Sequence, residues 1–337
     1  MAERAAGQGG AGSAASRRPA PAPSDDPVAA FLAASPCAGW RRQPLAGDAS
    51  ARRYERLTAP DGRSAVLMDA RAEPASVAPF LRIAAHLRGL GLAAPTVLAE
   101  GEGVLLLEDL GPETLAARLA RRPGEAPRLY GAAVDLLLRL QAAPPPAGLA
   151  ALTPQRLAGM IAPLWEHFLP RTDARLAAGI GEGLQDALER HAPQPSVLSL
   201  RDFHAENLIW RPQRKGLDRL GLLDFQDAVL APPEYDLASL LRDARRDTDA
   251  ELRAAMTRRF AEGTGRSEAA VAAAAAVLGL ARNLRILGIF ARLAQERGRT
   301  GYLAFVPRLR AHLAGDLAHP ALAALAPLLR RALGDPA

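Results

Sequence analysis

The stretch "RDFHAENLIW", residues 201–210, places an acid, an imidazole and an amide beside large apolar side chains. Its acid, Asp202, and its amide, Asn207, are spaced as D-x-x-x-x-N, and the apolar residues 208–210 are typical of a short buried strand. Such a strand would anchor the polar loop, so this stretch predicts side chains that are positioned for chemistry rather than buried.

A second acid follows in "GLLDFQD", residues 221–227, where Asp224 ends an apolar run. A turn over residues 212–218 predicts a hairpin that brings Asn207 and Asp224 side by side at its open end. A carboxylate and an amide oxygen can bind a hard cation such as Mg²⁺. Asp202, on the loop leading in, is then free to orient a hydroxyl group and accept its proton. This division of roles is the one that phosphoryl transfer requires.

The whole chain has 337 residues, of which 49% are hydrophobic, so it is long enough for one large domain or two lobes. Residues 1–26, mostly Ala, Gly, Ser, Pro and Arg, predict a disordered tail. Residues 27–110 mix strand-like and helical runs and predict a small lobe. Residues 111–337 are almost entirely helical apart from a β-like island at 196–230. The expected fold class is therefore α+β, with a small β-rich N-lobe and a larger, mostly helical C-lobe.

The individual elements are expected from periodicity and turn residues. In the small lobe we expect strands at 54–58, 64–70 and 103–110, and helices at 28–34 and 79–89. In the large lobe we expect helices at 113–121, 126–142, 154–169, 172–191, 234–245, 248–262, 267–295 and 301–333.

The net charge of +6 does not indicate a nucleic-acid partner, because basic residues are spread along the chain and only 4% of residues are aromatic. Lys215 is the only lysine, so nearly all of the positive charge is arginine. An anionic small-molecule substrate is compatible with this charge.

The compartment is indicated by features that the sequence lacks. The longest uncharged apolar run, residues 269–281, is too short to span a bilayer, and the first residues contain no signal-peptide segment. One cysteine, Cys37, rules out an internal disulfide and favours a reducing compartment. We therefore expect a cytoplasmic monomer without a membrane partner.

Motifs of other site types are missing from the sequence. It contains neither G-x-x-x-x-G-K-[ST] nor G-x-G-x-x-G, so P-loop and dinucleotide-binding interpretations have no residues to support them. The histidines do not have the spacing of a zinc site.

The stretches around Asp202 and Asp224 resemble the catalytic and metal loops of protein-kinase-like enzymes, because D-x-x-x-x-N is followed by a strand, a turn and a D-F strand. With "LLDFQDAVLAPPEYDLASLL" they are similar to the aminoglycoside phosphotransferase and choline kinase branch. The stretches "GDASARRYERL", "AVLMDA", "LLLEDLG" and "RNLRILGIFARL" most resemble the bacterial kinases that phosphorylate N-acetylmuramate or N-acetylglucosamine at the anomeric position. The likeness covers residues 28–333.

This resemblance implies a bilobal protein-kinase-like fold that uses ATP and Mg²⁺. Asp202 would be the catalytic base, and Asn207 and Asp224 would be the Mg²⁺ ligands. Asp236 would brace the catalytic loop from the following helix. The N-lobe would bind the nucleotide, and the C-lobe would carry the catalytic loops and the sugar site.

Two further stretches are implied to bind the nucleotide. The hinge between the lobes would offer backbone groups to adenine, and its residues are Glu108, Asp109 and Leu110. A turn between the first two strands would cover the phosphates, and its residues are Gly47, Asp48, Ala49 and Ser50.

One family residue is missing from the sequence. The third-strand lysine that neutralises the nucleotide phosphates would fall on Met68, and Lys215 lies in the wrong hairpin to replace it. The expected replacement is an arginine beside the phosphate turn, either Arg52 or Arg53.

Four residues are candidates for the acceptor site, each with a structural alternative. His204 would face the substrate or bond to the backbone of its loop. Trp165 would stack on a sugar ring or pack in the core. Arg282 and Asn283, which follow a long apolar run, would form a cleft wall or an ordinary helix surface, and Arg282 could bind the carboxylate of an acid sugar. Glu206, in contrast, is expected to face solvent or pair with an arginine.

The implied function is ATP-dependent phosphotransfer to the anomeric hydroxyl of N-acetylmuramate or N-acetylglucosamine, giving the sugar 1-phosphate for cell-wall recycling. One alternative is a kinase of an aminoglycoside, an amino alcohol or another sugar, although the acids of the helical lobe are too scattered for a polycation site. The other is a nucleotide-binding pseudokinase, suggested by the missing lysine. Retention of Asp202, Asn207 and Asp224 together argues against that second alternative.

Overall fold

Five antiparallel strands form the sheet of the N-lobe, in the order β1-β2-β3-β5-β4. They belong to a computed structural model that describes residues 26–45 and 51–334. The strands are β1 (Arg41–Pro44), β2 (Arg53–Thr58), β3 (Ser64–Asp69), β4 (Val97–Gly101) and β5 (Val104–Glu108). The strands expected at 54–58, 64–70 and 103–110 are β2, β3 and β5. The exposed β1 and the half-exposed β4 were not expected, because they lack a run of apolar residues.

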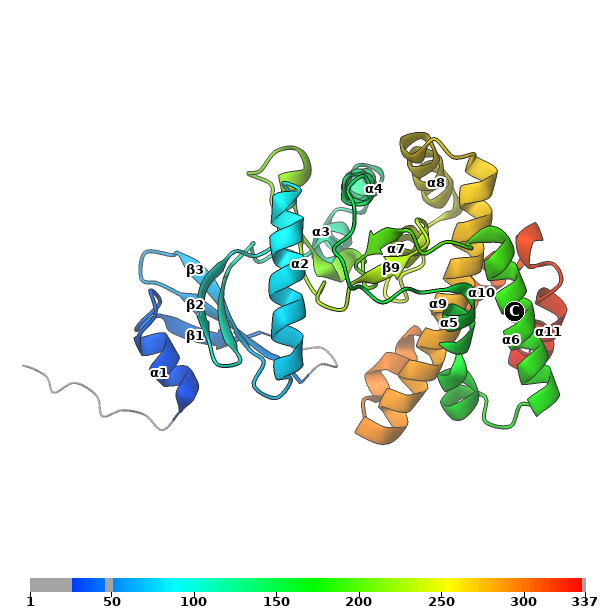
Figure 1. The fold of residues 1–337 in the computed structure, drawn as a ribbon, viewed down its shortest axis with the longest axis horizontal. Helices are drawn as coiled ribbons and strands as arrows, with labels where there is room; N and C mark the ends of the chain where they lie inside the picture. Colours follow the sequence, from blue (N-terminus) through cyan, green and yellow to red (C-terminus); the bar gives the residue numbers. More distant parts are fainter. Residues whose placement is uncertain (1–25, 46–50, 335–337) are drawn as a thin grey trace, which may run out of the picture.

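Two helices cover the two faces of this sheet, α1 (Pro27–Ala33) and α2 (Val77–Gly89). Figure 1 shows α2 on the side of the C-lobe. Helix α1 shares a hydrophobic cluster with Leu67 of β3. Helix α2 shares a second cluster with the next residue of the same strand, Met68. Neighbouring residues of a strand point to opposite faces, so β3 contributes to both cores.

Two expectations fall largely outside the described residues. Of the tail expected over residues 1–26, only Asp26 is described, and its carboxylate caps α1 by accepting a hydrogen bond from the Val28 backbone at 3.0 Å. The turn expected to cover the phosphates lies entirely outside them; its residues are Gly47, Asp48, Ala49 and Ser50.

The C-lobe is built around α9 (Glu268–Arg297), which runs through its centre in Figure 1. Its other helices are α3 (Leu115–Arg121), α4 (Ala126–Gln141), α5 (Pro154–Gly159), α6 (Ala174–His191), α7 (Tyr235–Leu241), α8 (Ala250–Thr264), α10 (Val306–Leu317) and α11 (Ala326–Leu333). Its strands are β6 (Val197–Ser199), β7 (Leu208–Trp210), β8 (Leu220–Leu222) and β9 (Val229–Ala231). β6 pairs with β9 and β7 with β8. The expected α+β class, with a β-rich N-lobe and a helical C-lobe, is confirmed.

Two of the expected helices are wrong as continuous segments. The helix expected at 154–169 ends at Gly159 and resumes, after Pro163, as a π-helical turn. The helix expected at 301–333 is interrupted after α10 by a turn that begins at Pro320. A proline lacks the backbone N–H that a helix needs and crowds the preceding turn, which the apolar periodicity alone does not reveal.

Helix α9 is longer than the apolar run 269–281 and continues past it through Arg282 to Arg297. By length and composition alone it passes the test for a membrane-crossing helix, with an 18-residue window of mean hydropathy 1.5. However, 78% of that window is buried inside the protein, so α9 is the core helix of the C-lobe.

Candidate functional site

The β7–β8 hairpin brings the two expected metal ligands together. The strands pair so that Leu208 lies opposite Leu222. Just beyond this pair, the Leu223 backbone N–H donates to the Asn207 carbonyl at 3.0 Å. Asn207 and Asp224 therefore lie on neighbouring segments at the open end of the hairpin. The sequence predicted this arrangement from the turn at residues 212–218.

The backbone is unusual at two points of this region. Arg201 (φ +67°) and Asp224 (φ +56°) are the non-glycine residues with positive φ in the described chain. A left-handed backbone costs a residue with a side chain about 1–3 kcal/mol. One of these residues adjoins Asp202 and the other is itself an expected metal ligand, so the surrounding structure fixes both loops in a strained geometry.

Asp236, on α7, is bonded to the start of the catalytic loop. Its carboxylate accepts hydrogen bonds from the Ser199 hydroxyl and from the Leu200 backbone N–H, both at 2.7 Å. The side chain is fully buried. This burial raises the pKa of Asp236 to about 6, although the two hydrogen bonds act to lower it. The contact has the geometry that a bracing role requires.

Asp202 is accessible, charged and fixed by its neighbours. Its backbone carbonyl accepts a hydrogen bond from the Asn207 amide at 2.9 Å, and its Oδ1 lies 3.3 Å from Nη2 of Arg282. Burial favours the neutral acid, but nearby positive charges, of which Arg282 is the strongest, outweigh it and lower the pKa of Asp202 below its ordinary value. About 40% of the side chain stays exposed. The carboxylate is thus ionised and open to an incoming hydroxyl group.

Arg52 reaches from the N-lobe into the same region. Its Nη2 lies 3.1 Å from Oδ1 of Asp224, and its Nε lies 3.9 Å from Oε2 of Glu73. Arg52 is buried, whereas the next residue, Arg53, is exposed. Met68 is fully buried on β3 and supplies no charge. Of the two arginines expected to replace the lysine, Arg52 is the one that faces the catalytic loops.

The oxygen atoms at the hairpin suit a magnesium ion. The amide nitrogen of Asn207 is bonded to the Asp202 carbonyl, which leaves the amide oxygen to act as a ligand. The Asp224 side chain is 38% exposed. No group of three His, Cys, Asp or Glu side chains suited to a metal lies in residues 26–45 and 51–334. Mg²⁺ does not need one, because it retains water and shares phosphate oxygens.

The hinge side chains contact protein groups. Asp109 accepts hydrogen bonds from Arg56 at 2.7 and 3.1 Å and from the Gly111 backbone at 3.0 Å. Glu108 accepts a hydrogen bond from the Thr96 hydroxyl at 2.9 Å. The Leu110 side chain is buried. These contacts fix the chain between the lobes, and adenine binding by the hinge backbone stays a prediction.

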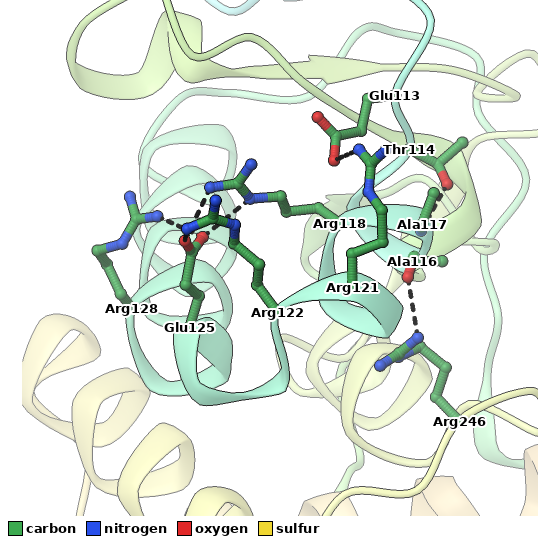
Figure 2. A network of polar contacts seen from close by, with 10 residues as sticks. All are labelled: Glu113, Thr114, Ala116, Ala117, Arg118, Arg121, Arg122, Glu125, Arg128 and Arg246. Atoms are coloured by element: carbon green, nitrogen blue, oxygen red, sulfur yellow. Dashed lines mark hydrogen bonds and ion pairs between the residues drawn. The ribbon is translucent and has the colours of Figure 1, made fainter.

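Helix α3 packs against the short turn Ala205–Asn207 of the catalytic loop. Figure 2 shows the polar contacts around this helix. Thr114 caps the helix by accepting a hydrogen bond from the Ala117 backbone at 3.0 Å, and its hydroxyl lies 3.4 Å from Glu206. Arg246 donates to the Ala116 carbonyl at 3.0 Å. Glu206 is exposed and bonds to a threonine rather than to an arginine. Figure 2 also shows three arginines around Glu125: Arg118, Arg122 and Arg128.

The other acceptor candidates lie near Asp202, on α9 or in the turn that packs on α9. His204 is buried, and its Nδ1 has no hydrogen-bond partner among the described residues. Burial also lowers the pKa of His204 and favours the neutral imidazole. Asn283 is completely buried, and its amide lacks a partner in the described structure. Trp165 is half-buried in the π-helical turn that packs on α9. Their substrate roles stay predictions.

Three side chains of this region were not singled out in the sequence. Glu73 approaches Arg52, and Gln226 donates to Asp224 at 3.0 Å. Arg285 lies one helical turn after Arg282 on α9, so the i, i+3 spacing of the two arginines was the available signal. Glu73 had no comparable signal, because its partner Arg52 is distant in the sequence. Gln226 had none either, because its partner Asp224 is only two residues away.

Several known proteins are similar to this chain. Residues 41–273 match the model of the phosphotransferase enzyme family. The N-acetylmuramate/N-acetylglucosamine kinase of Caulobacter vibrioides is 38% identical over 88% of this chain and 93% of its own length. The kinase of the same name from Pseudomonas aeruginosa is 34% identical over 85% and 87%. A choline/ethanolamine kinase family protein from Mesorhizobium loti superposes with a TM-score of 0.61 at 20% identity, covering 90% of this chain and 98% of that chain.

Proposed function

This chain belongs to the phosphotransferase enzyme family and is an ATP-dependent kinase of a sugar, and we propose that its acceptor is the anomeric hydroxyl of N-acetylmuramate or N-acetylglucosamine. The proposed product is the sugar 1-phosphate, for the recycling of cell-wall sugars. One observation carries the proposal. Asp202, Asn207 and Asp224 meet at the open end of one hairpin, in a chain 38% identical to a kinase of that name.

Asp202 is proposed to orient the anomeric hydroxyl group and to accept its proton. As the sugar oxygen bonds to the γ-phosphorus of ATP, the bond from that phosphorus to the β–γ bridging oxygen breaks, and ADP leaves. The exposed, ionised carboxylate and its contact with Arg282 support this role. The anomeric hydroxyl is a suitable acceptor because it is more acidic than an ordinary alcohol.

The charge on the transferred phosphoryl group needs compensation from the protein. Asn207 and Asp224 would hold Mg²⁺, which supplies positive charge to the phosphates when it is bound. Arg52 would add the cation that the family lysine supplies elsewhere. Its position beside Asp224 and Glu73, on the boundary of the two lobes, supports this role.

The proposal extends to the whole chain. Residues 27–110 would bind ATP, with adenine against the backbone of Glu108, Asp109 and Leu110. Residues 111–337 would bind the sugar, with His204 and Trp165 near it. We propose that the protein acts as a cytoplasmic monomer on this small-molecule substrate.

A panel of acceptors tests the function. The purified full-length protein is incubated with ATP and Mg²⁺ and either N-acetylmuramate, N-acetylglucosamine, kanamycin or choline, and ADP release is measured. We expect release with the two amino sugars. We also expect the reducing end of the consumed sugar to disappear, because a 1-phosphate blocks ring opening whereas a 6-phosphate does not. ADP release with choline or kanamycin alone, or a reducing product, would contradict the proposal.

A further inference from the structure

Three arginines lie in or close to the Asp202 loop. Arg282 is in contact with Asp202 at 3.3 Å. Arg201 is the residue before Asp202, and Arg285 follows Arg282 by one turn on α9, so it projects from the same side of the helix. All three lower the pKa of Asp202, which places their charges in one neighbourhood.

Arg285 lacks the acidic partner that such a position calls for. Its side chain is half-buried, and no hydrogen bond or ion pair joins it to another described residue. Burial, with the nearby cations Arg201 and Arg282, lowers the pKa of Arg285. A guanidinium that loses water among other cations is unfavourable unless an anion joins it. The surroundings of Arg285 therefore suit an anionic ligand.

Nitrogen atoms without hydrogen-bond partners lie in the same place. Within the described chain, Nε of Arg201 and Nε of Arg282 are buried without an acceptor, and the ring Nδ1 of His204 is buried without a partner. Buried polar atoms without partners are uncommon in folded proteins. Together with the arginine charges, these unpartnered nitrogens make the neighbourhood of Asp202 favourable to an anion.

We propose that Arg285, together with Arg201, forms an anion subsite that binds the lactyl carboxylate of N-acetylmuramate. A guanidinium group binds a carboxylate through two parallel hydrogen bonds. The sequence suggested Arg282 for this role, but Arg282 is already in contact with Asp202. The inference rests on the proposed function. It adds that these arginines set the preference between the two sugars, because N-acetylglucosamine lacks the lactyl group.

The ratio of kcat/KM for N-acetylmuramate to kcat/KM for N-acetylglucosamine isolates this contact. Arg285 also influences Asp202, but that effect is shared by both sugars and cancels in the ratio. We expect Arg285→Met to lower the ratio by about tenfold to a hundredfold, as for loss of a hydrogen bond to a charged group. Arg285→Lys should restore part of it. Arg292→Met, an exposed arginine of the same helix, should leave the ratio within about twofold of wild type.

The methyl ester of N-acetylmuramate removes the charge from the substrate and leaves the protein intact. Wild type should lose about as much kcat/KM on the ester, relative to the acid, as the Arg285→Met variant loses in the ratio of the two sugars. The ester and the variant together should lose little more than either alone, because they remove the same contact.

Three results would overturn this inference. If Arg285→Met loses kcat/KM equally on both sugars, the role of Arg285 is structural. If wild type turns over the acid and the ester equally well, no cation binds the carboxylate. Both leave sugar phosphorylation, and hence the proposed function, intact. Wild type that phosphorylates neither sugar would overturn the proposed function as well.

Discussion

The Arg52 guanidinium lies 3.1 Å from the Asp224 carboxylate, although 172 positions separate the two residues in the sequence. Arg52 immediately precedes β2 of the N-lobe and Asp224 follows β8 of the C-lobe, so this ion pair joins the two lobes. Glu73 approaches the other side of the guanidinium. A cation therefore lies at the boundary of the two lobes, although Met68 occupies the position of the family's third-strand lysine.

If Arg52 neutralises the nucleotide phosphates, Arg52→Met should lower kcat/KM for ATP by about 10²–10³-fold, the range seen when one group that stabilises transition-state charge is removed. Arg52→Lys should keep part of the activity, because it keeps the charge but not the planar fork. Steady-state kinetics with varied ATP measures both.

The neighbouring arginine provides the comparison. Arg53 is exposed, so Arg53→Met should stay within about twofold of wild type. A larger loss in Arg53→Met than in Arg52→Met would contradict the assignment.

Arg282 is expected to set the acid limit of activity. Asp202 must be ionised to accept a proton, and Arg282 is the largest of the cationic influences that keep its pKa below the ordinary value. Arg282→Met should raise the pKa of Asp202 and move the acid limb of the kcat/KM profile to higher pH. The profile is recorded with N-acetylglucosamine, which carries no carboxylate of its own. An acid limb that stays in place, or moves to lower pH, would show that Asp202 is not the group that titrates.

Asp236 should make the stability of the fold depend on pH. Its pKa rises from 3.8 to about 6 in the folded protein, so it binds its proton more tightly than in the unfolded chain. Its contribution is present below pH 3.8 and is lost as the pH rises through about 6. The loss is at most about 3 kcal/mol in the free energy of unfolding.

The variant Asp236→Asn carries no titrating group there, so its unfolding free energy should fall less than that of wild type between pH 4 and pH 7. Urea unfolding at several pH values measures the difference. Asp316, whose pKa is also raised to about 6, titrates in both proteins and cancels. Parallel curves for the two proteins would refute the buried ionisation.

Gly288 allows α9 to approach the π-helical turn that carries Trp165. A β-carbon there would meet the backbone of Pro163 and Leu164. We expect Gly288→Ala to destabilise the protein by about 1–3 kcal/mol through overpacking. A β-carbon at Gly179, within α6, meets nothing within 4 Å, so Gly179→Ala should stabilise it by about 0.5–1 kcal/mol. Thermal unfolding of the pair checks this. Similar midpoints for both variants would argue against the close approach.

Short-range sequence patterns were enough to predict most of the fold and the core of the site. Asp202 and Asn207 precede β7, and Asp224 follows β8, so one strand, a turn and a second strand connect them. Local spacing and apolar runs were therefore enough to predict that they meet. The continuous helices expected at 154–169 and 301–333 were wrong near Pro163 and Pro320, because the apolar periodicity does not reveal where a helix is interrupted.

The remaining parts depend on which face a side chain takes in three dimensions. Arg52 and Arg53 are neighbours in sequence, and only the completed sheet shows that one is buried against Asp224 while the other is exposed. The electrostatic environment of Arg285 depends on Arg201, which belongs to a loop that is distant in the sequence. Distant pairs of this kind leave no periodic signal in one sequence.

The central claim is that Asp202 accepts the proton of a sugar hydroxyl during phosphoryl transfer. The most direct test is the turnover of N-acetylglucosamine by Asp202→Ala, measured with ATP and Mg²⁺ beside a thermal unfolding curve. Loss of a positioned base predicts a fall in kcat of about 10²–10⁴-fold. The unfolding midpoint should stay near that of wild type, because the side chain is 40% exposed. Turnover at the wild-type rate by the folded variant would contradict the account.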